Sequence, residues 1–197
     1  STKNTTAVID GKASVVGLKD LKTKDVVEIA TEPRFVVRAG DSKVVICGAG
    51  EYEVGDLTIR GVAAQRYIDT ENDEKIATVY RLESGDIRAA VIGNIHGVLD
   101  DDQLEAIGLI DILVIPVGGG GYTLDATDAA TIVRQLEPKI VVPVHYRDSV
   151  LKYEVPQEEL ELFVKELGAP VEVVPKLKVK SGSTLPAATT IYQVTRS

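Results

Sequence analysis

The first half of the chain consists of short apolar runs separated by polar or glycine-containing turns. Val, Ile, Thr and Tyr at this short spacing are typical of β-strands. Three pairs of runs flank turn-forming residues, namely Ala-Gly-Asp-Ser, Gly55-Asp56 and Ser84-Gly85, and these predict hairpins and therefore antiparallel pairing. The predicted strands are Thr6–Asp10, Lys12–Val16, Val26–Thr31, Phe35–Arg38, Lys43–Cys47, Tyr52–Val54, Leu57–Val62, Ala77–Glu83 and Ile87–Ile92.

In the second half the apolar period changes, and helices alternate with strands. Ala129, Ile132, Val133 and Leu136 lie on one face of a helix predicted over Ala126–Leu136, which Pro138 terminates. Further helices are predicted at Asp101–Ile107, after the acidic start at Asp100, and at Gln157–Leu167, before Gly168. Continuous apolar runs predict buried strands at Ile112–Val117 and Ile140–Val144, and closing strands at Val171–Val179 and Thr189–Thr195.

This order of elements predicts an α/β fold with two β-layers and helices on the outside, rather than a doubly wound sheet. The 197 residues are expected to form one domain, residues 1–197, with a core of ordinary size.

Composition and net charge limit the classes of partner that this protein is expected to bind. The net charge of −8 argues against nucleic acid, because phosphate binding requires a basic surface. No apolar run is long enough for a membrane helix, so a membrane is not expected as a partner and a cytoplasmic location is predicted. A single cysteine excludes an intrachain disulfide and a multi-cysteine metal site. The acidic surface and the β-rich edges indicate a homo-oligomer.

The segment from Ile110 to Tyr146 combines a buried strand, a glycine run, a helix and a second buried strand. His145 follows the second strand, and residues at the carboxyl ends of buried strands face crevices where ligands bind. The run Gly118–Gly121 exposes backbone N–H groups that could hold an anion or a small-molecule ligand, with Tyr122 beside it. Both features also have purely structural explanations, a strand-end histidine and a tight passage from strand to loop.

Other candidate residues have structural alternatives of the same kind. His96 lies in Gly93-Asn94-Ile95-His96-Gly97 directly after a strand, where a turn is equally expected. Asp125 and Asp128 precede or begin a helix, and helix capping accounts for them.

The second half of the chain contains five motifs of note: Asp111-Ile-Leu-Val-Ile-Pro-Val-Gly-Gly, Tyr122-Thr-Leu-Asp, Asp128-Ala-Ala, Leu136-Glu-Pro-Lys and Val142-Pro-Val-His-Tyr146. Through these motifs it resembles the metallo-β-lactamase fold superfamily. The similarity covers roughly residues 35–150. The branch that the chain resembles most consists of predicted metal-dependent hydrolases and includes ascorbate-6-phosphate lactonase. Gly48–Val54 resembles a segment of a divergent bacterial subgroup of that branch.

The resemblance implies a four-layer αββα sandwich with a site at one edge between its two sheets. His145 matches the last metal-ligand histidine of the family, and Asn94 stands where the family has a metal-bridging aspartate. The segment Val62–Tyr67 lacks an expected histidine, and Ile29–Pro33 stands in place of the His-x-His-x-Asp-His signature. The first strand of the fold is expected to be missing before Ser1, through truncation or an unseen loop.

Two hypotheses follow from this comparison. In the first, the protein keeps the fold with a degenerate metal site and serves a non-catalytic or weakly active role in ligand binding or assembly. In the second, it is a metal-dependent hydrolase of an ester, lactone or phosphoester, because a metal activates water and polarises the substrate. Zinc or manganese would then bind at His145, with Asn94, His96 and Glu32 as helpers and Gly118–Gly121 with Tyr122 facing the substrate. A dinuclear zinc site is not expected with two histidines.

Overall fold

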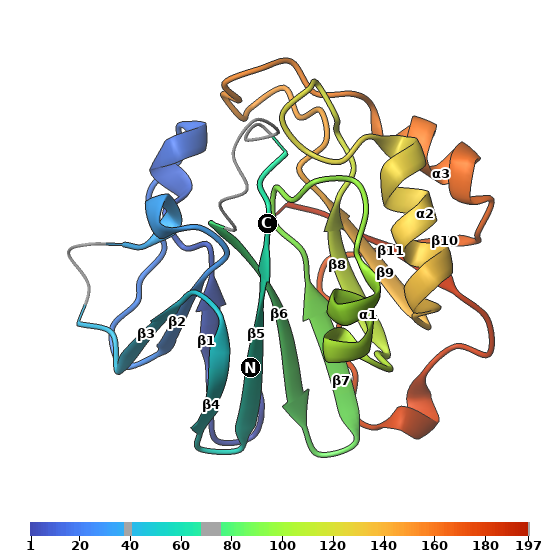
Figure 1. Cartoon of the computed structure of the whole chain (residues 1–197). Helices are drawn as coiled ribbons and strands as arrows, with labels where there is room; N and C mark the ends of the chain where they lie inside the picture. Colours follow the sequence, from blue (N-terminus) through green and yellow to red (C-terminus); the bar gives the residue numbers. More distant parts are fainter. Residues whose placement is uncertain (38–40, 68–75, 197) are drawn as a thin grey trace.

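Two β-sheets pack face to face in the computed structural model, which describes residues 1–37, 41–67 and 76–196 (Figure 1). The smaller sheet has the strand order β1-β2-β3, and the larger has the order β10-β11-β9-β8-β7-β6-β5-β4. The strands are β1 Ala7–Ile9, β2 Val27–Ala30, β3 Val44–Cys47, β4 Gly50–Val54, β5 Leu57–Ala64, β6 Ala77–Ser84, β7 Ile87–Val91, β8 Ile112–Pro116, β9 Ile140–Val144, β10 Val171–Val174 and β11 Thr190–Val194.

The α-helices of the described residues all lie on the outer side of the larger sheet (Figure 1). They are α1 Asp101–Ile107, α2 Ala126–Leu136 and α3 Leu160–Leu167. The α/β class predicted from the order of elements is confirmed, and the structure shows that the larger sheet mixes parallel and antiparallel pairs. None of the helices in the described part of the chain is long and apolar enough to cross a bilayer.

The larger sheet separates two apolar cores because its side chains alternate between its faces. On strand β6, Val79 faces the helices and packs with Ile107 and Phe163, all of which are buried. Tyr80 on the same strand faces the smaller sheet and packs in the cluster that contains Ile29. Strand β6 therefore packs against both layers, which explains why its first four residues, Ala77–Tyr80, are all buried.

Helices α1 and α2 have the bounds that the sequence predicts, because their ends carry strong local signals. Asp100 caps α1 in a reciprocal arrangement with Gln103, and the Asp125 carboxylate accepts hydrogen bonds from the first turn of α2. Helix α3 begins at Leu160, three residues later than the predicted Gln157. The capping prediction for Asp125 is confirmed.

The predicted hairpin between Phe35–Arg38 and Lys43–Cys47 is wrong. Pro33–Phe35 forms a 3-10 turn (η2), and β3 pairs in parallel with β2, which also pairs in parallel with β1. Arg38 and the predicted turn residues Ala39 and Gly40 lie outside the described residues. The run Lys12–Val16, predicted as a strand, contains the 3-10 turn Ala13–Val16 (η1). The apolar composition of these two segments favoured strands. Which strands pair, and whether they pair in parallel, depends instead on contacts between distant segments.

The other two predicted hairpins are confirmed. Strands β4 and β5 pair antiparallel, as do β6 and β7, while β7, β8 and β9 continue the sheet in parallel. The parallel strands β1 and β2 of one sheet and β7, β8 and β9 of the other thus bring several strand ends to one edge of the sandwich (Figure 1). Side chains just beyond those ends build the candidate site.

Candidate functional site

A cavity of about 330 Å³ opens at this edge, between the ends of the two sheets. Asp10 follows β1, Thr31 follows β2, Asn94 lies beyond β7 and His145 follows β9 directly; all four line the cavity. Crevices beyond the carboxyl ends of parallel strands are the usual ligand sites of such sheets. The cavity therefore brings together His145 and Asn94, both of which the sequence analysis names as candidate site residues.

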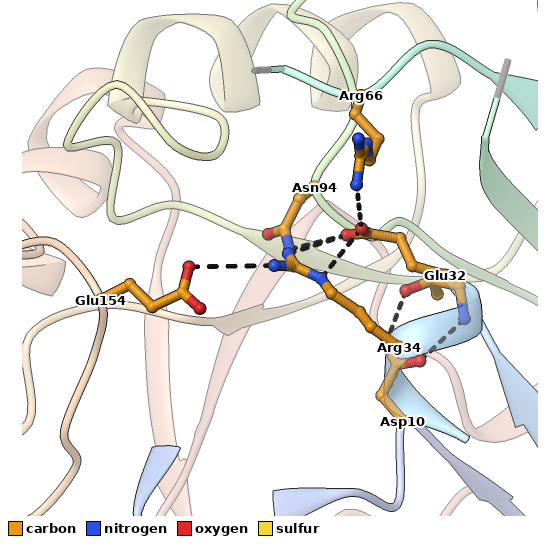
Figure 2. Close-up of polar contacts among 7 residues, drawn as sticks. Asp10, Glu32, Arg34, Arg66, Asn94 and Glu154 are labelled. Atoms are coloured by element: carbon orange, nitrogen blue, oxygen red, sulfur yellow. Dashed lines mark hydrogen bonds and ion pairs between the residues drawn. The ribbon is translucent and has the colours of Figure 1, made fainter. Parts of the chain in front are cut away.

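Glu32 is the centre of an ion-pair cluster behind this cavity (Figure 2). Its side chain is 1% exposed, and its Oε2 lies 3.0 Å from Nε of Arg34 and 3.5 Å from a guanidinium nitrogen of Arg66. The Nδ2 group of Asn94, itself 6% exposed, donates to Glu32 Oε1 at 3.1 Å, as does Arg34 at the same distance. Two cations and an amide therefore surround one buried carboxylate, which is the condition for keeping such a charge inside a protein.

Arg34 connects the cluster to the loops around the cavity. Its guanidinium lies over the rings of Phe35 and Tyr122, at 4.7 and 5.1 Å from their centroids. The exposed Glu154 carboxylate approaches it to 3.8 Å (Figure 2). Burial is the largest single effect and lowers the pKa of Arg34, but the charges of Glu32 and Tyr122 and the hydrogen bonds to both together outweigh it, so the pKa lies above its ordinary value. Arg34 is thus a permanent cation within the site.

His145 is packed among aromatic rings. Tyr153 stacks on it with centroids 4.8 Å apart, and Tyr122 meets it edge-on at 5.8 Å. Burial, with the nearby charge of Arg34, lowers the pKa of His145 to about 4, so the imidazole is neutral at pH 7. Its φ of +52° is uncommon for a residue other than glycine. A neutral imidazole can act as an acceptor or a donor toward a ligand.

Asp10 closes the other side of the cavity floor. Its two carboxylate oxygens accept hydrogen bonds from the backbone N–H and the hydroxyl of Thr31, each at 2.8 Å. Burial nevertheless raises the pKa of Asp10 to about 6, and the charge of Glu32 adds to this. Gly93 allows the close approach of β7, since a Cβ atom there would lie 2.6 Å from the Thr31 hydroxyl.

The run Gly118–Gly121 lies next to His145. Its glycines are required by close packing and by positive φ angles. A Cβ atom on Gly118 would lie 2.2 Å from the carbonyl oxygen of His145, so only glycine fits. Gly119, Gly120 and Gly121 all have positive φ, and the N–H of Gly119 donates to Leu124. Tyr122, which ends the run, reaches both His145 and Arg34. The anion-holding role predicted for the run remains a prediction.

His96 lies apart from this cavity. It is exposed, stacks on Tyr67 at 6.2 Å, and lines a separate recess of about 100 Å³ with Gln103. Of the three helper residues predicted from the sequence, the structure brings Glu32 and Asn94 together and places His96 elsewhere. Within residues 1–37, 41–67 and 76–196, no three His, Cys, Asp or Glu side chains are grouped so that they could hold a metal ion.

Reasoning from sequence missed Arg34, Arg66, Asp10, Tyr153 and Glu154. Asp10 carried a usable signal, because it directly follows an apolar strand, as His145 does. The arginines carried none, since charged residues in loops are normally solvated.

The pH dependence of stability is expected to contain two opposing contributions from this cavity. The folded pKa of Asp10, about 6, lies above its ordinary value of 3.8, so its contribution is complete below pH 3.8 and is lost as the pH rises through 6. The folded pKa of His145, about 4, lies below 6.5, so its contribution is complete above pH 6.5 and is lost as the pH falls through 4. Each amounts to on the order of 3 kcal/mol.

The substitution Asp10→Asn therefore removes the Asp10 contribution to the pH dependence of stability and leaves the His145 contribution in place. Relative to the unmodified chain, the variant is expected to gain stability steadily between about pH 4 and 6, measured by urea unfolding across that range. Asp102→Asn, an exposed carboxylate in the first turn of α1, is the control. A stability difference for Asp10→Asn that does not change with pH would contradict the prediction.

Comparison with known proteins places this geometry in a family. A model described as the β-lactamase superfamily domain matches residues 8–145. UPF0173 proteins of Pyrococcus furiosus and Pyrococcus abyssi are 31% identical over 96 residues and 30% identical over 127 residues. These matches cover 49% and 64% of this chain but only 41% and 56% of those proteins, so the chain spans about half the length of the curated relatives it matches.

Solved structures agree in fold. A protein from Thermotoga maritima, predicted to be a Zn-dependent hydrolase of the metallo-β-lactamase superfamily, has a TM-score of 0.73 at 23% identity, covering 99% of this chain and 93% of that one. Igni18, a metallo hydrolase from Ignicoccus hospitalis, has a TM-score of 0.61 at 15% identity, covering 85% and 84%. At these identities the likeness concerns the fold alone. Because the family model spans well over half of the chain, this protein belongs to the β-lactamase superfamily domain family and has the metallo-β-lactamase fold.

Proposed function

We propose that this protein binds a small molecule in the cavity at the sheet edge and does not hydrolyse it through a metal centre. The observation that carries the proposal is that the buried carboxylate of Glu32 already has hydrogen-bond and ion-pair partners within the protein. Its two carboxylate oxygens already receive donors from Arg34, Arg66 and Asn94, at the positions that the family resemblance assigns to metal binding.

The donor set supports this proposal. A zinc site takes about four ligands, usually imidazole, thiolate or carboxylate. The cavity offers one imidazole, His145, and the Asp10 carboxylate, whose oxygens both accept hydrogen bonds from Thr31. The guanidinium of Arg34 would in addition repel a metal cation held between Glu32 and His145. The described residues therefore do not fit a zinc or manganese centre of the family kind.

The cavity itself is suited to ligand binding. Its volume, about 330 Å³, is at the lower end of the range for small-molecule sites. Apolar side chains form much of its wall, and a few polar groups converge at its floor, the usual composition of such sites. Val15, Phe35 and Leu151 belong to the wall, while Thr31 and Asn94 belong to the floor.

Metal analysis tests the proposal directly. The purified protein, after incubation with excess zinc or manganese and desalting, is expected to retain well below one metal ion per chain by inductively coupled plasma mass spectrometry. About one ion per chain, lost in His145→Ala but kept in His96→Ala, would overturn the proposal. His96 is the matched control because it is the other histidine of the chain and lies outside the cavity.

A metal-dependent hydrolase of an ester, lactone or phosphoester is the second candidate function. Membership of the family and the position of His145 at the end of β9 favour it. The Thermotoga maritima structure, described as a predicted Zn-dependent hydrolase, supports it by fold alone. Turnover of p-nitrophenyl esters, lactones or phosphoesters that requires added metal and disappears in His145→Ala would establish it.

A further inference from the structure

The floor of the cavity presents mainly hydrogen-bond acceptors. The Asp10 carboxylate has lone pairs beyond those used by Thr31, and the Thr31 hydroxyl donates its proton to Asp10. Asn94 donates one N–H of its Nδ2 group to Glu32, so its amide oxygen, together with the second N–H, is left for a ligand. An acceptor-rich, negatively charged floor attracts a group that carries several N–H donors and a positive charge.

The side of the cavity at Lys12 has the opposite character. Lys12, two positions after Asp10 in the chain, is half-buried and lines the same cavity. Within the part of the chain that the structure describes, the Lys12 ammonium makes no ion pair or hydrogen bond, although its charge helps to lower the pKa of the Asp20 carboxylate. This ammonium is therefore available to an anionic group of a ligand.

The remaining wall is apolar and comes from separate elements. Val15 and Val16 belong to η1, Phe35 to η2, and Leu151 to the segment between β9 and α3. A ligand that contacts the floor and Lys12 would place any further atoms against this wall. Burial of an apolar group there would contribute affinity in proportion to the area removed from water.

We propose that the cavity binds a free α-amino acid with an apolar side chain. Its ammonium group lies against Asp10 and the Asn94 amide oxygen, its carboxylate against Lys12, and its side chain against the apolar wall. A simple anion would be repelled by Asp10, and a simple amine by Lys12, whereas a zwitterion satisfies both. The proposal rests on the proposed ligand-binding function and names the chemical class of the ligand.

Isothermal titration calorimetry of the whole chain with L-leucine and L-phenylalanine tests it. We expect saturable binding, weakened by about tenfold or more for N-acetyl-L-leucine, which lacks the ammonium, and for L-leucinamide, which lacks the carboxylate. No measurable binding of either amino acid, or equal binding of leucine and N-acetyl-leucine, would overturn the inference.

Two variants assign the ends of the ligand. Lys12→Gln is expected to weaken leucine binding by about tenfold while leaving leucinamide binding unchanged, and Asp10→Asn to weaken leucine but not N-acetyl-leucine. Lys19→Gln, an exposed lysine that does not line the cavity, is the control. Thermal unfolding of each variant separates lost binding from lost folding.

The outcome is distinguishable from that of the proposed function. If the protein is metal-free and inactive as a hydrolase but binds no amino acid, the ligand class is wrong while the proposed function stands. If metal analysis finds an ion that His145 holds, the proposed function fails whatever the amino acid titrations show.

Discussion

Glu32→Gln is expected to lower the free energy of unfolding by about 3 kcal/mol, because it leaves buried positive charge without its counter-ion. Arg34 and Arg66 both lie within 3.5 Å of Glu32 Oε2, and glutamine has no charge to offset them. The expected loss is at the lower end of the range for buried pairs, since both guanidiniums are partly exposed and can be rehydrated. Urea unfolding measures it, and a fall in melting temperature of about 6–12 °C accompanies it.

Glu51→Gln is the matched control for this substitution. Glu51 pairs with Arg60 at 2.8 Å on the surface of the larger sheet, where both side chains are well exposed. Its loss is expected to cost less than about 1 kcal/mol. If the two glutamine variants are equally stable, Glu32 does not hold the cluster together. The double variant Glu32→Gln with Arg34→Met should recover part of the stability, since it removes one of the uncompensated charges.

Gly118→Ala is expected to destabilise the protein by about 2–3 kcal/mol and to displace His145. The added methyl group would lie 2.2 Å from the His145 carbonyl oxygen and 2.5 Å from Oε1 of Gln157. The first of these atoms belongs to backbone, which cannot rotate away, so the end of β9 must move. Unfolding by urea measures the cost, and the imidazole resonances of His145 in a ¹H–¹⁵N spectrum report the displacement.

Gly121→Ala separates this steric effect from the conformational one. Gly121 has a φ of +72°, but a Cβ atom there meets nothing within 4 Å. Alanine at this position is expected to cost only about 1–2 kcal/mol, from the left-handed backbone alone. The His145 resonances should stay unchanged in this control. Displacement of His145 in both variants would show that the loop moves as a whole.

Local signals in the sequence were sufficient for several elements. The caps Asp100 and Asp125 and the apolar period that ends at Leu136 predicted α1 and α2 with their bounds, since helix ends depend on residues within one turn. Strand β9 was predicted over its full length because a continuous apolar run is typical of a strand buried on both faces.

The candidate site could be predicted only in part. His145 was found because it follows a buried strand, and the family resemblance drew attention to Asn94 and Glu32. The contact between Glu32 and Asn94 joins residues 62 positions apart, and no local pattern encodes such a contact. Arg34 and Arg66 were missed for the same reason, because an arginine in a loop is identified as a buried counter-ion only once its partner is placed.

The sequence by itself determined the positions of the helices, most of the strands, the family resemblance and the shortage of metal-binding side chains. Only the tertiary structure decided that β1, β2 and β3 pair in parallel, and that the strand ends converge on an ion-pair cluster beside a small cavity. The physical reason is the distance along the chain over which each kind of interaction acts. Helix caps and apolar periodicity act over a few residues, whereas parallel pairing and the neutralisation of Glu32 depend on the packing of segments far apart in the chain.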